Sequence, residues 1–432
     1  MALLDIIVLS GVFVVLLVLG TPISYSIGLA TLATMLLSID TLPALTTVAQ
    51  RMATGLDSFA LLAIPFFIFS GQLMNRGGIA RRVINFAKVL VGRLPGGLAF
   101  VNITAAMLFG AISGSAAAAV AAIGGFMGPV MKKEGYDPNF STAVNITSAT
   151  TGLVIPPSNI LIVYSLASGG ASITALFLAG YLPGILTGVM LMLVAGFIAK
   201  RKNYPTIPGI KLWEAVRYFL EAIPSLLLIV IVIGGIIAGY FTATEASAVA
   251  VLYTFILSVL VYKEVKWSQL PSILLSTVAT TSIVMLLIGT SMSMSWILSY
   301  ENIPQNVSAA LISLTDSKIV ILLIINLILL IVGTFMDMTP AVLIFTPIFL
   351  PVVTALGISP VHFGIMMVLN LCVGLCTPPV GSVLFLGCGI AGTSIEKVIK
   401  PLIPLFIAMI IALLLTTFIP GLSLFIPRLF GY

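Results

Sequence analysis

Long apolar runs alternate with short polar or glycine-rich stretches along almost the whole chain. The hydrocarbon core of a bilayer is about 30 Å thick and needs about 20 residues of helix, so apolar runs of roughly that length predict membrane spans. The uninterrupted runs occupy residues 4–20, 23–38, 59–74, 173–199, 222–240, 244–262, 271–298 and 400–419, and a polar stretch, residues 200–221, separates two halves. The pattern predicts an all-α polytopic membrane protein.

Two further runs are too long for one span and are interrupted near their middle. Residues 98–131 are broken at Ser113-Gly114-Ser115, and residues 319–355 are broken at Met336-Asp337-Met338-Thr339-Pro340. Two full crossings would need about 40 residues and a turn, which neither run provides. Both are predicted to be re-entrant hairpins, which enter and leave the membrane on the same side.

Two more runs, residues 139–167 and 361–390, contain a Pro-Pro pair in related sequences, GLVIPPSN at 152–159 and GLCTPPVG at 374–381. Proline lacks a backbone N–H and disfavours helix at the preceding residue, so each run should break there. Broken backbone at membrane depth is tolerated only where protein or a wet cavity covers it. Paired breaks in two halves are a strong sequence indication of a transporter's binding site.

The breaks recur at a constant spacing. Gly114 and Asp337 are 337 − 114 = 223 residues apart, Pro156 and Pro378 are 378 − 156 = 222 apart, and the spans ending at Met74 and Leu298 differ by 224. Five crossings separate one copy from the next, and an odd number inverts the second copy. An inverted repeat is therefore predicted, with ten spans and two hairpins.

Charge supports the inversion. The stretch after the first-copy span, residues 76–93, carries five basic residues, whereas its counterpart, residues 299–318, carries Glu301, Asp316 and a single Lys318. Basic loops favour the cytoplasm, so the first stretch is placed there and both termini outside. Both stretches are predicted to be amphipathic arms along the interface. Solvated linkers are the alternative.

Composition fits a membrane protein: 60% of the residues are hydrophobic, 7% are charged, and the mean hydropathy is +1.25. The net charge of +6 then reflects cytoplasmic loops rather than nucleic-acid binding. The chain has no Walker A sequence, no Ser/His/Asp set and no Cys/His metal spacing, so no enzyme is predicted. The three cysteines, Cys372, Cys376 and Cys388, lie in apolar helical context and are predicted to pack.

The broken elements bring oxygen atoms together. In the first half these are Ser113, Ser115, Asn145, Thr147, Ser148, Thr150, Thr151 and Ser158, and in the second half Asp337, Thr339, Asn370, Thr377 and Ser382. Oxygen sets with at most one carboxylate fit Na⁺ better than transition metals, which prefer nitrogen or sulfur.

Four residues have competing interpretations. A carboxylate at membrane depth marks a functional site by default, but Asp337 also precedes a helix start and could be its N-cap. Glu245 is either a helix cap or a site residue, and Ser113 could belong to a small-residue helix contact. His362, the sole histidine, is predicted to lie at the outer interface rather than to act as a proton relay.

Five stretches together resemble the large membrane subunit of tripartite ATP-independent periplasmic (TRAP) transporters. They are GAISGSAAAAVAAIG at 110–124, GLVIPPSN, FTATEASAVA at 241–250, GTFMDMTPA at 333–341 and GLCTPPVG. The resemblance runs from the first span to the last. It implies an elevator-type transporter of the bacterial inner membrane, driven by Na⁺, with a small membrane subunit and a periplasmic substrate-binding protein. The substrate would be an organic acid of the C4-dicarboxylate or sialic acid class.

Carried over by motif, one sodium site would contain Ser113, Gly114, Ser115, Gly152, Ile155 and Ser158. The other would contain Gly333, Asp337, Thr339, Cys376, Thr377 and Pro378. Substrate would lie between the hairpin tips, near Asn145, Ser148, Thr150, Thr151, Asn159 and Ser382.

The resemblance also implies a division of the chain. Residues 1–75, 169–298 and 393–432 would form a scaffold, residues 76–97 and 299–318 the arms, and residues 98–168 and 319–392 the two halves of a mobile transport domain. Two other functions stay open at this point: a stand-alone carboxylate or anion carrier without accessory proteins, and a channel or scaffold subunit.

Overall fold

The computed structural model describes the chain except Met1, Pro95, residues 206–209, Asp316 and Pro379. Its described secondary structure consists of helices, as predicted. The first half contains α1 (Ala2–Val18), α2 (Ile23–Ser38), α3 (Thr41–Leu56), η1 (Phe59–Leu62), α4 (Ala63–Arg76), α5 (Ile79–Val91), α6 (Gly97–Ser113), α7 (Ala116–Ala119), η2 (Val120–Gly124), α8 (Gly125–Lys133), α9 (Pro138–Val154), α10 (Asn159–Ala167) and α11 (Ile173–Arg201).

The second half contains α12 (Leu212–Ile237), α13 (Ala243–Phe255), η3 (Ile256–Val261), η4 (Trp267–Gln269), α14 (Leu270–Tyr300), α15 (Ile303–Leu314), α16 (Lys318–Phe335), α17 (Met338–Ala355), α18 (Pro360–Gly374), α19 (Ser382–Ala391), α20 (Ile395–Phe418) and α21 (Gly421–Leu429). Of the described helices, 8 are long and apolar enough to cross a membrane, or up to 9 if the bent pair α9–α10 is one span.

Three helical stretches differ from the sequence prediction. Helices α3 and α21 lie in stretches for which no element was predicted, because both are shorter or more polar than a membrane span. The polar stretch 200–221 is helical from Leu212 onward, since α12 begins there and continues into the apolar run without a break.

All four predicted interruptions are helix ends. Helix α6 ends at Ser113 and α16 at Phe335, and the chain resumes at α7 and α17. The two Pro-Pro segments separate α9 from α10, with a bend of 51°, and α18 from α19. Proline's missing donor and its clash with the preceding turn explain why the two runs with a Pro-Pro pair stop there.

Helix starts recur at nearly constant spacing. Ile79 and Ile303 begin α5 and α15, with 303 − 79 = 224. Pro138 and Pro360 begin α9 and α18, and Ile173 and Ile395 begin α11 and α20; both differences are 222 (360 − 138 and 395 − 173).

Both predicted arms are helices, α5 and α15. In α5, Ile79, Val83, Ile84 and Ala87 are buried along one face at helical spacing. Lys88 lies beside this face, where partial burial lowers the pKa of its ammonium group because the charged form loses hydration.

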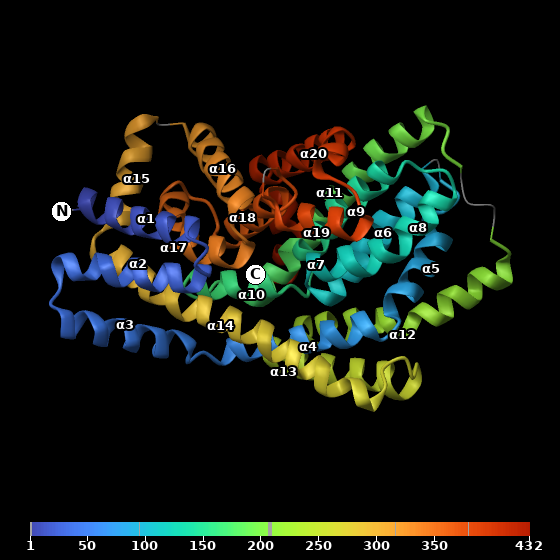
Figure 1. The fold of residues 1–432 in the computed structure, drawn as a ribbon, viewed down its shortest axis with the longest axis horizontal. Helices are drawn as coiled ribbons and strands as arrows, with labels where there is room; N and C mark the ends of the chain where they lie inside the picture. The colour runs from blue at the N-terminus through green and yellow to red at the C-terminus, as the bar shows by residue number, and fades with distance from the viewer. Residues whose placement is uncertain (1, 95, 206–209, 316, 379) are drawn as a thin grey trace.

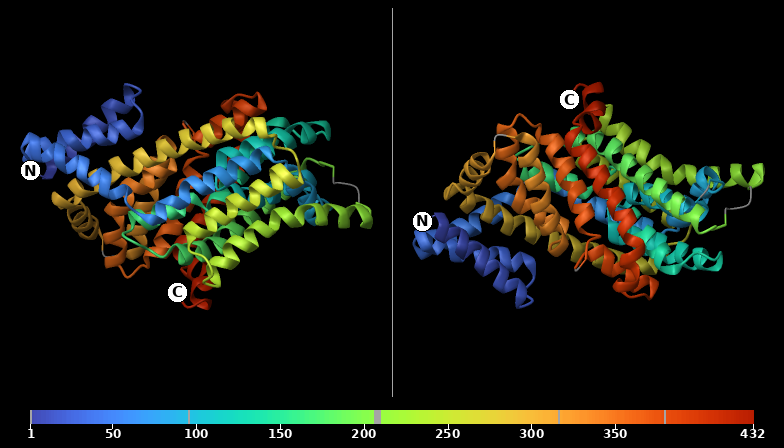
Figure 2. Two further views of the ribbon diagram at one scale, coloured as in Figure 1. Left: turned by 90° about the horizontal axis from the view of Figure 1, so that it is seen from below. Right: turned by 90° about the horizontal axis from the view of Figure 1, so that it is seen from above.

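The helices form two layers (Figure 1). In one layer, α14 packs against α2, α3 and α4, while α13 packs against α4 and α12. In the other, α6 packs against α9, α16 against α18, and α20 against both α9 and α11. Figure 2 shows α1–α3 at one end of the molecule and the start of α12 at the other. Helices α11 and α20, which were predicted to belong to the scaffold, thus pack with the hairpins and broken helices.

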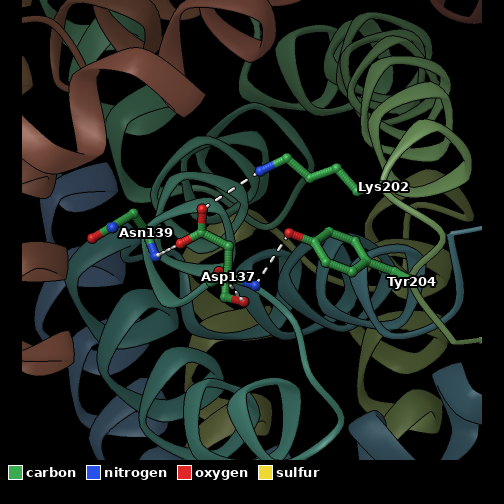
Figure 3. A network of polar contacts seen from close by, with 5 residues as sticks. Asp137, Asn139, Lys202 and Tyr204 are labelled. Atoms are coloured by element: carbon green, nitrogen blue, oxygen red, sulfur yellow. Dashed lines mark hydrogen bonds and ion pairs between the residues drawn. The ribbon is translucent and has the colours of Figure 1, made fainter.

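A polar cluster ties α11 to the base of the first hairpin (Figure 3). The Lys202 ammonium lies 3.5 Å from the Asp137 carboxylate, which also accepts the Asn139 backbone N–H at 2.9 Å and so caps α9. The Tyr204 ring stacks on Tyr136 at 4.3 Å, and burial raises the pKa of the Tyr136 phenol. These contacts join the α8–α9 turn to the end of α11.

Candidate functional site

The two hairpin tips meet at one cavity of about 550 Å³. Ser113, Gly114 and Ser115 line it from the first tip, and Asp337, Met338 and Thr339 line it from the second. Asn159 and Ser382, which begin α10 and α19 directly after the two Pro-Pro segments, complete this side. The structure therefore brings together seven of the residues predicted for the ion and substrate sites: Ser113, Gly114, Ser115, Asn159, Asp337, Thr339 and Ser382.

The first tip is a sharp turn with one unused hydroxyl. Gly114 follows the last residue of α6 as its C-cap and adopts the left-handed region at φ +61, a backbone conformation that favours glycine. Ser115 caps α7, since its side-chain oxygen accepts the Ala118 N–H at 3.2 Å. The buried Ser113 hydroxyl has no hydrogen-bond partner among the described residues, and neither has the side-chain oxygen of Asn159 beside it. Both are available to a ligand.

The tip is also close to the other layer. A Cβ atom on Gly71 of α4 would lie 2.8 Å from the Ser113 carbonyl oxygen. Only a glycine at this position lets α4 approach the tip so closely.

The second tip provides a carboxylate. Asp337 occupies the N-cap position of α17, but its side chain makes no capping hydrogen bond to a described residue. The residue is exposed, and it lines the cavity. The alternative interpretation of Asp337 as a capping side chain therefore has no hydrogen bond to support it, and the carboxylate oxygens are open to a ligand.

Each hairpin packs on its broken helix through a pair of glycines. In the first half, a Cβ on Gly152 would lie 2.2 Å from the Gly110 Cα. In the second half, a Cβ on Gly374 would lie 2.7 Å from the Gly333 Cα. The spacings, 333 − 110 = 223 and 374 − 152 = 222, match those of the tips. Gly152 and Gly333, which were predicted for the ion sites, thus lie where two backbones touch.

The first Pro-Pro segment is closed on itself. Ile155 and Ser158 are buried, and the Ser158 hydroxyl donates to the Leu153 carbonyl at 2.5 Å. Gly180 and Gly184 of α11 cover the segment: Cβ atoms on them would lie 2.1 Å from the Val154 oxygen and 2.3 Å from the Ile155 side chain.

The second Pro-Pro segment is held by its hairpin. The Gly381 N–H donates to the Thr334 carbonyl of α16 at 3.1 Å. The Thr377 hydroxyl donates to the Val373 carbonyl at 2.8 Å, and Pro378 is partly buried beside it. Cys376 is fully buried and contacts the first broken helix instead, with its sulfur 3.6 Å from the Ile146 carbonyl.

Four residues predicted to bind substrate lie away from this cavity's lining. Ser148, Thr150 and Thr151 are buried, and their hydroxyls donate to carbonyls of their own helix. Asn145 lines a second cavity of about 340 Å³ near Asn102 and Lys132, and its amide donates to the Val120 carbonyl at 3.1 Å.

Three polar residues of the cavity were not predicted. Gln72 and Asn75 of α4 and Thr280 of α14 line it from the other layer. Gln72 and Asn75 are three residues apart and share one helix face. Two amide side chains one turn apart in an otherwise apolar run are a signal that could have identified them.

Glu245 and His362 lie outside the cavity lining. Glu245 forms a capping box with Thr242, whose N–H donates to its carboxylate at 2.8 Å, so its interpretation as a helix cap is confirmed. His362 lies in the first turn of α18 and is buried beneath α21, where its Nδ1 is 2.6 Å from the Ser423 hydroxyl. In the described part of the chain, no group of three or more His, Cys, Asp or Glu residues could hold a metal ion.

Comparison with protein families matches residues 10–422 to the DctM component of tripartite ATP-independent periplasmic transporters. The chain is 57% identical to the uncharacterized protein YgiK of Salmonella typhimurium, over 99% of this chain and 98% of that one. It is 38% identical to the C4-dicarboxylate TRAP transporter large permease protein DctM of Rhodobacter capsulatus, over 98% and 99% of the two chains. It is 39% identical to the sialic acid TRAP transporter large permease protein SiaM of Vibrio cholerae, over 96% of each.

The fold is similar to that of a solved transporter. The YdaH transporter of Alcanivorax borkumensis superposes with a TM-score of 0.65 at 16% identity, over 91% of this chain and 90% of that one. At this identity the likeness concerns the fold alone.

Proposed function

The chain belongs to the DctM family, the large permease component of tripartite ATP-independent periplasmic transporters, and we propose that it imports an organic acid across the bacterial inner membrane together with Na⁺. The substrate is a C4-dicarboxylate or an acid of the sialic acid class, as in the relatives' names.

The observation that carries this proposal is the convergence of four helix starts on the 550 Å³ cavity. Helices α7, α10, α17 and α19 begin at Ala116, Asn159, Met338 and Ser382, and all four residues line it. Helix N-termini carry a partial positive charge and unpaired N–H groups, which suit a carboxylate. Among the described lining residues Asp337 is the sole charged side chain, so an anionic substrate needs a cation to offset it.

Sodium is the cation that the oxygen atoms fit. In the first half, the free Ser113 hydroxyl and the carbonyls around Gly114 form a neutral set. In the second half, Asp337 and Thr339 add a carboxylate and a hydroxyl. Such all-oxygen sets suit a small hard cation.

Transport by an elevator movement is supported by the two layers. Gln72, Asn75 and Thr280 face the cavity from the layer of α4 and α14, while the hairpins face it from the other. The constant helix spacing supports an inverted repeat, whose two copies expose the site to opposite sides in turn. Helices α11 and α20 then move with the hairpins, and α5 and α15 act as arms.

The proposal includes two partners, a small membrane subunit and a periplasmic substrate-binding protein, as the family's description as tripartite implies. A stand-alone anion carrier is the alternative. Uptake of labelled dicarboxylate or sialic acid into proteoliposomes, with and without the binding protein, separates the two. Uptake that persists unchanged without the binding protein would favour the stand-alone carrier.

Sodium coupling is tested without knowing the substrate. Thermal unfolding of the purified chain with its small subunit is compared in NaCl, KCl and choline chloride. A ligand that binds only the folded state adds about 2.7 kcal/mol to the free energy of unfolding at a hundredfold excess over Kd. We expect stabilisation in NaCl alone. Equal melting in the three salts would contradict resting sodium sites.

A further inference from the structure

A second charged cavity, of about 450 Å³, lies where the arm α5 meets α12. Arg81 and Arg82 line it from α5, Arg217 and Glu221 from α12, and Tyr262 and Glu264 from the segment after η3. Three arginines face two glutamates, so these charged groups sum to +1. Charge asymmetry between the arms places this side of the molecule in the cytoplasm.

Arg82 forms a fixed wall of the cavity. Its guanidinium carbon lies 3.5 Å from the centre of the Tyr262 ring, and its Nη1 donates to the Gly78 carbonyl at 2.9 Å. Its Nη2 is 4.0 Å from the Glu264 carboxylate. Stacking on an aromatic face orients a guanidinium plane, so the site has one preorganised cationic group.

The other two guanidinium groups keep donors free. Arg217 uses its Nε to bind Glu221 at 2.8 Å, which leaves its two terminal nitrogens unused among the described residues. The exposed Arg81 side chain makes no ion pair or hydrogen bond to a described residue. Free arginine forks are suited to bidentate binding of a phosphate group.

An apolar strip continues from the cavity along α12. Val216, Phe219 and Leu220 are 41%, 47% and 58% exposed, and the Phe219 ring packs on Phe86 of α5 at 5.8 Å. A free phosphate ion would make no contact with this apolar strip, whereas the acyl chains of a lipid would cover it.

We propose that this cavity binds the phosphate headgroup of an anionic phospholipid whose acyl chains lie along α12. Basic pockets between helices at the cytoplasmic side of a membrane suit such headgroups. Because α5 connects α4 to the first hairpin, the bound lipid holds the arm against α12 and so fixes the point from which the hairpin moves.

The test is lipid retention by the purified chain with its small subunit, measured by native mass spectrometry and by thermal unfolding. The probes are phosphatidylglycerol, phosphatidylcholine, glycerol 3-phosphate and inorganic phosphate. The variant is Arg81→Gln/Arg217→Gln. The matched control, Arg93→Gln/Lys211→Gln, removes two positive charges at a place outside the cavity, where Arg93 donates to the Ile210 carbonyl.

We expect retention of phosphatidylglycerol but not of phosphatidylcholine, a roughly thirtyfold loss in the cavity variant, and at most a small change in the control. If the double variant does not fold, Arg81→Gln alone is used, because replacing an exposed side chain should leave the fold intact. Equal retention by both double variants would overturn the proposal. So would equal stabilisation by inorganic phosphate, which would show a free-anion site, or lipid binding that occurs only without the small subunit, which would show a subunit interface.

Discussion

The two Pro-Pro segments share a sequence pattern but are covered differently. The first is buried, and Gly180 and Gly184 of α11 pack on the Val154 carbonyl and the Ile155 side chain. At the offset of 222, α20 carries Leu402 and Phe406 instead, whose side chains prevent an equally close approach. The second segment accordingly stays more open, and Val380 is 41% exposed. The Pro-Pro segment of the first half is therefore more closely packed, whereas the second half contributes the carboxylate at its hairpin tip.

This difference has an electrostatic consequence. The first tip offers hydroxyl and carbonyl oxygens, and the second adds Asp337. A carboxylate strengthens cation binding, so the two proposed sites should bind Na⁺ unequally.

The largest expected effect concerns the glycine contacts. A Cβ on Gly110 would lie 2.5 Å from the Gly152 Cα, whereas one on Gly333 would lie 3.2 Å from the Gly374 Cα. We expect Gly110→Ala to lower the free energy of unfolding by about 3 kcal/mol, because so short a contact with backbone forces one helix to shift. Gly333→Ala should lower it by about 1 kcal/mol, because its longer contact needs only a small adjustment. Thermal unfolding measures both. Gly11→Ala is the control, because Gly11 has open space around it. Equal losses of stability in Gly110→Ala and Gly333→Ala would contradict the expected difference in packing between the two halves.

The next effect concerns the ion. Asp337→Asn should remove most of the sodium-specific stabilisation, about 2.7 kcal/mol at a hundredfold excess over Kd, whereas Ser113→Ala should remove only part. Melting curves in NaCl and choline chloride measure the difference. Glu396→Gln, an exposed carboxylate on α20, is the matched control. A larger loss in Ser113→Ala than in Asp337→Asn would reverse the assignment of the stronger site.

A smaller effect separates the two layers. Gln72 lines the cavity from α4, so Gln72→Ala should raise the KM for uptake about fivefold through a lost hydrogen bond to substrate. Sodium-dependent stabilisation should stay unchanged, since the proposed ion sites lie in the hairpin layer. Gln50→Ala, on the exposed face of α3, is the control. A loss of sodium stabilisation in Gln72→Ala would place an ion ligand in both layers.

The smallest effect compares two helix starts. Thr242 and Glu245 form a capping box at α13, whereas α2, which begins 243 − 23 = 220 residues earlier, has no side-chain cap among the described residues. Thr242→Ala should cost about 1 kcal/mol of stability, and Thr21→Ala should cost little. Neither change should alter uptake. If Thr242→Ala lost transport but kept normal stability, Glu245 would have a role in the transport site rather than only in helix capping.

Much of the architecture could be predicted from the sequence, because it depends on local chemistry. Apolar run length located the long helices, although α1 and α2 are too short to count among the helices that could cross a membrane. Proline and glycine located the breaks at Ser113, Asp337 and the two Pro-Pro pairs. The amphipathic pattern of α5 predicted a helical arm. Helix α3 was missed, since its sixteen residues are too polar to be recognised as a span.

The sequence by itself determined the family, the helical class and the positions at which helices must stop, since these follow from residue type and spacing. Only the tertiary structure decided which oxygens face the cavity. Thr150 and Ser158 bond to carbonyls near them in sequence, while Ser113 remains free. Gln72 reaches the site from a helix distant in sequence, and α11 rather than α20 closes over a Pro-Pro segment. Such facts depend on which distant segments pack together, and that is set by side-chain volume across the interface rather than by any local pattern.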